Sequence, residues 1–220
     1  MLSLELFAGS CTFSNVAKSY GYETFTTDSG LDLFEVGHYK KLDLVSDIFD
    51  IEISDLPDNP EIVWASPPCT TFSIASCGHH WYAPDQDGKR KPKTSKAEEG
   101  LYIVEKTIWI INELQPKYFF IENPRGLLRK MDCMQPLEKY RKTVTYCQYG
   151  DNRMKPTDIW TNLDWTPRPM CKNGATCHES APRGSATGTQ GLANKYERSK
   201  LPEDLCIEII EKIQKEKKGK

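Results

Sequence analysis

Residues 62–73, with the sequence IVWASPPCTTFS, join a short apolar run to a proline-rich turn that carries a cysteine. The run has the length and composition of a buried strand. In an open α/β sheet, ligands bind beyond the carboxyl ends of the strands, so a side chain in this turn would face a ligand. Cys69 is therefore a candidate nucleophile. The alternative is a buried and inert thiol, because most free cysteines are of that kind.

The overall composition limits the class of protein. The 220 residues, 38% apolar and 27% charged, are typical of one soluble domain with at most a small insert. No apolar run approaches the length of a membrane span and no signal peptide is recognisable, so we expect a cytoplasmic protein without a membrane partner. Eight scattered cysteines favour catalytic or metal-binding chemistry over a disulfide framework. A net charge of −2 argues against binding nucleic acid through bulk charge.

Strand and helix signals alternate along the chain. Strands are predicted over residues 2–7, 22–27, 42–48, 61–64, 117–121 and 142–149. Helices are predicted around Phe13, over 101–114 before Pro116, and over 202–213. This alternation is typical of an α/β fold with a doubly wound, mostly parallel sheet. We expect a catalytic domain over residues 1–160, a short loop-rich insert over 161–191, and a C-terminal helix within 192–220 that packs back on the catalytic domain.

Residues 74–97 are polar, basic and rich in Pro, Gly and His. Loops of this length in compact domains are usually lids or binding segments. Lys89 and Arg90 form a local basic patch, for which the alternative is a solvated loop. His79 and His80 fit lid packing and phosphate contact better than metal binding.

The end of the first predicted strand is a candidate cofactor site. Gly9 follows that strand, and Asp28 ends the second strand about twenty residues further on, as in folds that bind a nucleoside-type cofactor. Dinucleotide-binding turns have three glycines where this chain has one, so a cofactor without phosphates fits better. Asp47, beside Ile48, is placed to accept a hydrogen bond from an adenine amino group, although an ordinary strand-end aspartate is an equal interpretation.

Glu122 ends the apolar run 117–121 and precedes Asn123 and Pro124. A carboxyl group in such surroundings is expected to be shielded from water and to act as an acid. The alternative is a helix-capping or ion-paired glutamate.

Four segments, in order along the chain, resemble motifs of the DNA (cytosine-5) methyltransferase family. Residues 4–10 (LELFAGS) are similar to its S-adenosylmethionine motif, and residues 67–73 (PPCTTFS) to its nucleophile motif. Residues 120–126 (FIENPRG) resemble its glutamate motif, and residues 149–155 (YGDNRMK) the segment that lines the cytosine pocket. One such match would be chance, but the ordered set is specific. The chain resembles a small, phage-like member, expected in the cytoplasm of a bacterial or phage-infected cell.

The resemblance implies a Rossmann-like, S-adenosylmethionine-dependent fold that acts on duplex DNA with a flipped cytosine. Cys69 would add to ring carbon 6, Glu122 would hydrogen-bond the ring nitrogen and exocyclic amine, and Arg153 would complete the catalytic set. The cofactor would be bound by residues of the first three strand ends and the nucleophile turn: Phe7, Gly9, Ser10, Asp28, Asp47, Ile48 and Pro67. The DNA would be bound by side chains of three motifs and the lid: Ser73, Asn123, Lys155, His79, His80, Lys89 and Arg90.

The chain departs from the family pattern at three places. Cys11 and Thr12 stand where glycines are usual in the first motif. Arg153 and Lys155 stand where the family has a Gln and two Arg, so which of them contacts the base is open. The insert is far shorter than a typical target-recognition domain. We therefore expect a monomer with low sequence specificity, or one that obtains its target from a partner.

The insert holds candidate zinc ligands, Cys171, Cys177 and His178, with Cys147 as a candidate fourth. These residue types bind zinc, which would brace the insert. The spacing C-x5-C-H is not a familiar zinc pattern, so an unliganded cluster is the alternative.

Several other functions compete with DNA methylation. The same chemistry on RNA is the main alternative, because the motifs are shared by relatives that modify tRNA. A non-catalytic nucleic-acid-binding relative would be expected to lack Cys69 or Glu122, and both are present. An amino-group methyltransferase would have Asn or Asp in place of Cys69. The donor is S-adenosylmethionine or an analogue of it.

Overall fold

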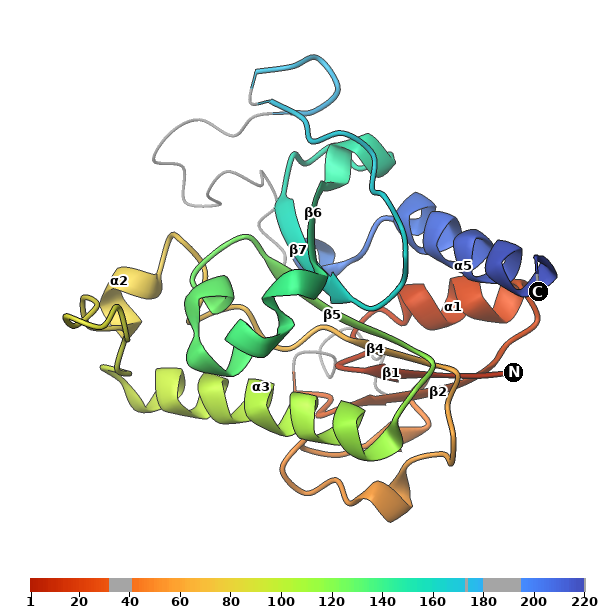
Figure 1. The fold of residues 1–220 in the computed structure, drawn as a ribbon, viewed down its shortest axis with the longest axis horizontal. Helices are drawn as coiled ribbons and strands as arrows, with labels where there is room; N and C mark the ends of the chain where they lie inside the picture. The colour runs from red at the N-terminus through yellow and green to blue at the C-terminus, as the bar shows by residue number, and fades with distance from the viewer. Residues whose placement is uncertain (32–40, 173, 180–194, 220) are drawn as a thin grey trace.

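A computed structural model describes residues 1–31, 41–172, 174–179 and 195–219 of the chain (Figure 1). These residues form a seven-stranded sheet with the order β3-β2-β1-β4-β5-β7-β6. Its strands are β1 (Leu2–Leu6), β2 (Glu23–Asp28), β3 (Leu44–Val45), β4 (Ile62–Ala65), β5 (Tyr118–Pro124), β6 (Arg141–Thr145) and β7 (Pro156–Thr161). The first five strands pair in parallel, and β7 is antiparallel to both β5 and β6. The predicted doubly wound, mostly parallel sheet is confirmed.

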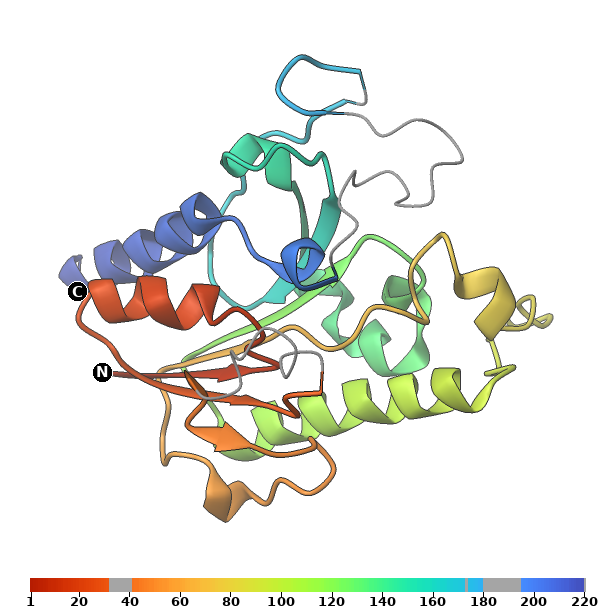
Figure 2. The same ribbon diagram turned by 180° about the vertical axis from the view of Figure 1, so that it is seen from behind.

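Helices cover both faces of the sheet. On one face, α1 (Thr12–Ser19) and α5 (Glu203–Lys218) lie side by side, and α3 (Ser95–Leu114) covers the other face (Figures 1 and 2). Shorter helical elements are η2 (Ile53–Asp55), α2 (Cys77–His80), η3 (Leu128–Lys130), η4 (Asp132–Tyr140), η5 (Tyr146–Tyr149) and α4 (Lys195–Ser199). Within the described ranges, no helix is both long and apolar enough to cross a membrane.

Strand β4 is buried on both faces, which explains its unbroken apolar sequence. Trp64 belongs to the apolar cluster under α1 and α5, and its ring stacks on Phe13 with centroids 4.7 Å apart. Val63 points to the opposite face and belongs to the cluster under α3. Full burial of each such side chain stabilises the fold by about 1.5–3 kcal/mol. Both apolar layers thus hold β4 in place, and with it the turn that follows.

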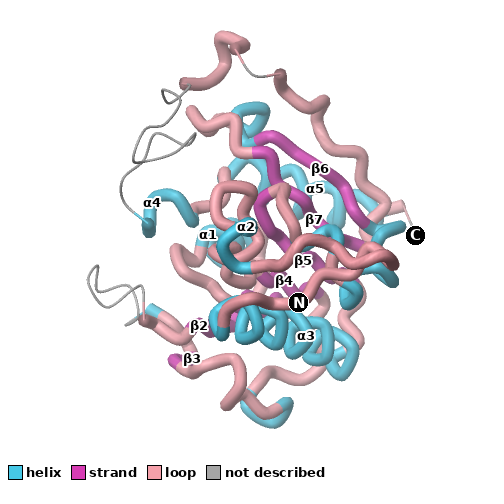
Figure 3. The backbone as a smooth tube through the Cα atoms, turned by 90° about the vertical axis from the view of Figure 1, so that its left-hand side faces the viewer, coloured by secondary structure: helices cyan, strands magenta, loops and turns pink. Residues whose placement is uncertain are grey.

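The sheet order places β1 and β4 side by side at its centre, with β2 and β3 beyond β1 and with β5 beyond β4. Chain connections leave β1 and β4 toward opposite edges, so a crevice is expected outside their carboxyl ends. The two candidate motifs that follow β1 and β4 therefore meet at one edge of the sheet. Figure 3 views the molecule from this side, where α2 also lies.

Four local expectations differ from the structure. Strand β3 has only two residues, and residues 146–149 form the helical turn η5 instead of continuing β6. Helix α5 continues to Lys218, beyond the expected end at 213. Strand β7 was not expected, because it starts with a proline and carries a charged Asp158. That aspartate is fully buried, and the Arg129 guanidinium and the Thr143 hydroxyl hydrogen-bond to it, which makes a charged strand residue tolerable.

The predicted lid, 74–97, is not one continuous loop. It contains α2 and a bridge between Trp81 and Pro92, and its last residues begin α3 at Ser95. The Trp81 side chain is buried, and its indole N–H donates to the Thr71 carbonyl at 3.0 Å. Burial of Trp81 explains why residues 74–97 are not one continuous loop. The mainly polar composition of the segment gave no sign of this apolar contact.

Candidate active site

The nucleophile turn, residues 66–73, begins where β4 ends at Ala65. The amides of Phe72 and Ser73 both donate to the Cys69 carbonyl at 3.0 Å, which closes the turn and leaves the Cys69 side chain partly buried. Phe72 is fully buried, and its carbonyl accepts from the Leu127 amide at 2.7 Å. The turn is thus fixed to the segment after β5.

Glu122 lies within β5, one residue beyond the Ile121 that is paired with Ala65 of β4. The expected position was just after the strand, but β5 continues to Pro124 because it also pairs with β7. The Glu122 side chain is 5% exposed. Glu122 and Cys69 therefore come from adjacent strand ends, and the expected shielding of the carboxylate is confirmed.

Two side chains contact the Glu122 carboxylate. The Tyr146 hydroxyl donates to Oε1 at 2.8 Å, and Lys155 Nζ lies 3.8 Å from the same oxygen. The Lys155 ammonium also lies over the Tyr146 ring, 4.7 Å from its centroid. Burial and the nearby Glu122 charge raise the pKa of Tyr146 well above its usual value, so the phenol stays protonated and donates. Sequence reasoning missed Tyr146, because a lone aromatic after a strand carries no signal beyond core packing.

Burial raises the pKa of the Cys69 thiol above its ordinary value. The Lys155 charge is the main effect that opposes this rise, and the Glu122 charge adds to it. The thiol is therefore the resting form, and the Lys155 charge favours the thiolate, which is the form that a nucleophilic cysteine requires. Cys69, Glu122 and Lys155 form one electrostatic unit.

Asn123, expected to contact DNA, is fully buried, and its amide nitrogen donates to the Pro67 carbonyl at 2.9 Å. This bond joins β5 to the nucleophile turn. The side chain therefore holds the turn in place and is too deep for direct DNA contact. Pro67, an expected cofactor residue, is also buried, whereas Ser73 lies within 3.3 Å of the Ser76 hydroxyl at the start of the lid.

The turn after β1 has an unusual backbone. Phe7, Gly9 and Cys11 all have positive φ, at 57°, 49° and 54°. Such values cost non-glycine residues about 1–2 kcal/mol each, so the surrounding structure must enforce them. The Gly9 amide donates to Asp28 Oδ2 at 3.2 Å, and Ser10 shares a 2.7 Å hydrogen bond with Thr12. The expected cofactor residues Phe7, Gly9, Ser10 and Asp28 are thus brought together.

Acidic side chains lie near this turn, and the Lys41 charge partly offsets theirs. Burial, followed by the charges of Glu5, Asp28 and Asp43, raises the pKa of the Cys11 thiol to about 12. Asp47 is exposed and accepts from the Phe49 amide at 3.0 Å, which matches the strand-end interpretation, while Ile48 is buried. An electronegative turn disfavours a phosphate group and suits a neutral or cationic cofactor.

Arg153 has contacts that the motif did not predict. It forms a buried ion pair with Asp151, and its guanidinium also donates to the carbonyls of Glu197, Arg198 and Lys200 at 3.0–3.3 Å. These bonds tie the segment after β6 to the residues before α5. Lys155, and not Arg153, is the basic residue paired with Glu122.

The lid residues mostly contact the protein itself. His80 is buried and shares a 2.8 Å hydrogen bond with Thr94. The His79 ring packs edge-on against the His80 ring, with the two ring centroids 4.9 Å apart. The expected lid packing is confirmed. Arg90 donates to the Tyr82 carbonyl at 3.0 Å, and Lys89 forms an exposed ion pair with Asp132 at 3.6 Å. DNA contact by these residues stays a prediction.

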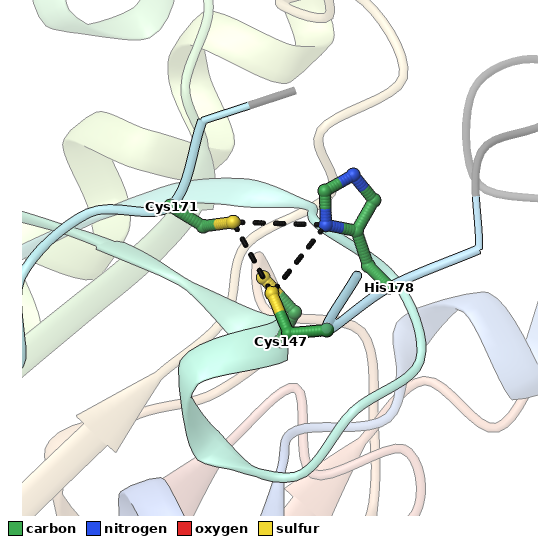
Figure 4. Close-up of side chains that lie close together, drawn as sticks. Cys147, Cys171 and His178 are labelled. Atoms are coloured by element: carbon green, nitrogen blue, oxygen red, sulfur yellow. Dashed lines mark hydrogen bonds between the residues drawn. The ribbon is translucent and has the colours of Figure 1, made fainter. Parts of the chain in front are cut away.

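The four candidate metal ligands come together. The sulfurs of Cys147, Cys171 and Cys177 and a ring nitrogen of His178 lie within 4.8 Å of one another (Figure 4). Cys147 comes from η5, and the other three come from the insert. The site lies outside the unit formed by Cys69, Glu122 and Lys155.

The family model for C-5 cytosine-specific DNA methylases matches residues 1–149, which include β1 to β6 and both Cys69 and Glu122. The chain belongs to this DNA methylase family. A relative of this methylase is a Frog virus 3 protein named "Probable DNA (cytosine-5)-methyltransferase". The two are 26% identical over 173 residues, which are 70% of this chain and 76% of the viral protein.

A solved structure with a TM-score above 0.5 shares the fold of this chain. A protein described as a prophage-encoded DNA modification methyltransferase from E. coli matches with a TM-score of 0.52 and 14% identity, over 76% of this chain and 49% of its own. A Spodoptera frugiperda DNMT2 mutant matches with a TM-score of 0.44 and 17% identity, over 74% and 51%. The methylase spans about half the length of these two chains. The first match supports the Rossmann-like fold.

Proposed function

We propose that this chain transfers a methyl group from S-adenosylmethionine to carbon 5 of cytosine in DNA through a covalent bond to Cys69. The observation that carries the proposal is the arrangement of Cys69 and Glu122 on adjacent strand ends, with Lys155 Nζ 3.8 Å from the Glu122 carboxylate. A nucleophile, a carboxyl group and a cation are the parts that attack on a poorly reactive pyrimidine ring requires.

The residues at the end of β1 fit S-adenosylmethionine. One glycine permits close backbone approach, Asp28 offers a carboxylate for ribose hydroxyls, and the negative surroundings suit a sulfonium. Phe7, Gly9, Ser10 and Asp28 would hold the cofactor, together with Ile48 and Pro67, and Asp47 would contact the adenine. When bound, the cofactor supplies an electrophilic methyl group.

In the proposed reaction, Cys69 Sγ bonds to carbon 6 of a cytosine that has left the base stack. The carbon 5–carbon 6 π electrons move toward carbon 5, which would take the methyl group as the methyl–sulfur bond breaks and the sulfur keeps that electron pair as a neutral thioether. Glu122, protonated for this step, donates a hydrogen bond to the ring nitrogen as charge develops there, and Lys155 holds the Glu122 side chain in place. A base then removes the proton from carbon 5, the double bond re-forms, and the carbon 6–sulfur bond breaks to release Cys69.

The segment that would select the DNA target is short in this chain. The region after β7 that would hold a target-recognition domain is short, so we propose a monomer of low sequence specificity, or one guided by a partner. We propose that residues 1–160 form the catalytic domain, that 161–191 replace the recognition domain, and that 192–220 complete the catalytic domain. We also propose a cytoplasmic location.

The test uses duplex DNA that contains 5-fluorocytosine, because fluorine at carbon 5 cannot be removed as a proton and the covalent complex accumulates. With S-adenosylmethionine, we expect an adduct that resists denaturation. It should be absent for Cys69→Ala and retained for Cys133→Ala, a partly buried free cysteine outside the site. No adduct with DNA of varied sequence would contradict the proposal, and an adduct only with 5-fluorocytosine RNA would reassign the substrate.

A further inference from the structure

We propose that Cys147, Cys171, Cys177 and His178 bind one structural zinc ion, which fastens the insert to the turn between β6 and β7. The observation that carries this proposal is the convergence of four ligand atoms from two segments that are distant in sequence. Three thiolates and one imidazole are a donor set that selects zinc in structural sites.

The sulfur–nitrogen distances match those around a tetrahedral zinc ion, and the two sulfurs would move apart by about 0.5 Å to bind it. Cys171 and Cys177 have their sulfurs 3.3 Å apart, and each sulfur lies 3.6 Å from His178 Nδ1. A zinc ion with Zn–S bonds of about 2.3 Å requires sulfurs about 3.8 Å apart at the tetrahedral angle. A disulfide would need about 2.05 Å between the sulfurs, so the cluster is open for an ion and not cross-linked.

The backbone around the cluster shows what the ion would hold. The Cys171 amide donates to the Thr145 hydroxyl at 2.8 Å, and the Glu179 amide donates to the Asn152 carbonyl at 2.8 Å. The insert segment is therefore attached at both ends of the 145–152 turn, with Cys147 inside that turn. The ion would add a third attachment between the two segments, at Cys147, between the hydrogen bonds at Thr145 and Asn152.

The insert segment has little else to stabilise it. Between Cys171 and Glu179, every described residue is partly or fully exposed. Segments without an apolar core are commonly held by a metal or by disulfides. A zinc ion would order the turn that leads to Arg153 and Lys155, so its role is to position those residues and not to take part in the reaction.

The first test is zinc content, measured by mass spectrometry on the full-length protein purified without chelators. We expect one zinc per chain, and loss of the zinc in Cys177→Ser, which alters an exposed ligand and should fold. His178→Cys keeps four ligands and should retain zinc. Cys133→Ser, outside the cluster, is the matched control and should also retain it.

Cobalt substitution tests the geometry. The Co²⁺ protein should show the visible absorption of a tetrahedral thiolate site, and Cys177→Ser should lose it. The proposal is overturned if the wild-type protein, after refolding with zinc, holds none, or if Cys171→Ser/Cys177→Ser retains a full equivalent. Formation of a Cys171–Cys177 disulfide in the presence of excess zinc would also overturn it.

Discussion

At the scale of single residues, Tyr146 decides how Glu122 is presented. Its hydroxyl donates to the carboxylate at 2.8 Å in a buried site. A hydrogen bond to a charged group contributes about 1.5–3 kcal/mol. We expect Tyr146→Phe to slow methyl transfer by about ten- to a hundredfold, since 1.4 kcal/mol corresponds to about tenfold.

Steady-state methylation of DNA, with kcat and KM separated, measures the effect. The control is Tyr149→Phe, which alters a second buried tyrosine whose hydroxyl contacts Glu208 and not Glu122. Equal kcat values for Tyr146→Phe and the wild type would show that the hydroxyl does not position Glu122.

Glu5 makes stability depend on pH. It is buried in β1, and this burial raises its pKa from the ordinary value of 4.5 to about 7. Between these values the folded chain binds more protons than the unfolded chain, so the free energy of unfolding falls as pH rises from about 4.5 to about 7.

We expect Glu5→Gln to remove this loss, because glutamine does not ionise and can still accept from the Ser14 amide. The variant should match the wild type near pH 4.5 and exceed its stability above pH 7 by about 3 kcal/mol, at about 1.4 kcal/mol per pKa unit. Urea unfolding across this range measures both proteins. If the free energies of unfolding of the two proteins change with pH in the same way, Glu5 does not have the raised pKa.

At the scale of elements, Gly126 lets the segment after β5 touch the nucleophile turn. A Cβ at this position would collide with the Phe72 carbonyl, the atom that accepts from Leu127. Overpacking of this kind costs about 1–3 kcal/mol. We expect Gly126→Ala to lower stability by that amount and to reduce adduct formation at Cys69.

The matched control is Gly78→Ala in α2, where no atom lies within 4 Å of an added Cβ. It should leave unfolding and adduct formation unchanged. If Gly126→Ala behaves like Gly78→Ala, the close approach of the two segments does not hold the nucleophile turn.

At the scale of the whole molecule, Arg153 closes the fold by joining Asp151 to backbone carbonyls more than forty residues further along the chain. Breaking a buried ion pair costs about 3–5 kcal/mol. We expect Arg153→Met to lower the Tm and to speed trypsin cleavage after Arg198 and Lys200. Lys155→Met removes one bond to the Arg198 carbonyl, at 3.4 Å, so it should speed that cleavage less than Arg153→Met does. It should also slow methylation, because Lys155 pairs with Glu122.

The comparison separates structural from catalytic roles. Loss of methylation in Arg153→Met at unchanged Tm and cleavage would restore the catalytic role that the motif suggests for Arg153. Loss of zinc in that variant, by contrast, would be a secondary effect of the disturbed 145–152 turn.

The sequence alone indicated the parallel part of the sheet and the two residues proposed to react, Cys69 and Glu122. Apolar runs such as 62–64 indicate strands from neighbouring residues alone. Cys69 and Glu122 each follow such a run within a recognisable motif. The end of β6 and the presence of β7 were not predictable in this way. They depend on antiparallel pairing and on a buried Arg129–Asp158 ion pair, which are contacts between distant residues.

Only the tertiary structure decided which residues contact Glu122. The motif left Arg153 and Lys155 as alternatives for contact with the base. In the folded chain both side chains donate to the Arg198 carbonyl, and Lys155 is the one that also pairs with Glu122. Folding also placed Cys147 next to the other three candidate metal ligands, which lie more than twenty residues further along the chain. The physical reason is that charge pairing, burial and ligand geometry act through space, whereas a sequence pattern records only spacing along the chain.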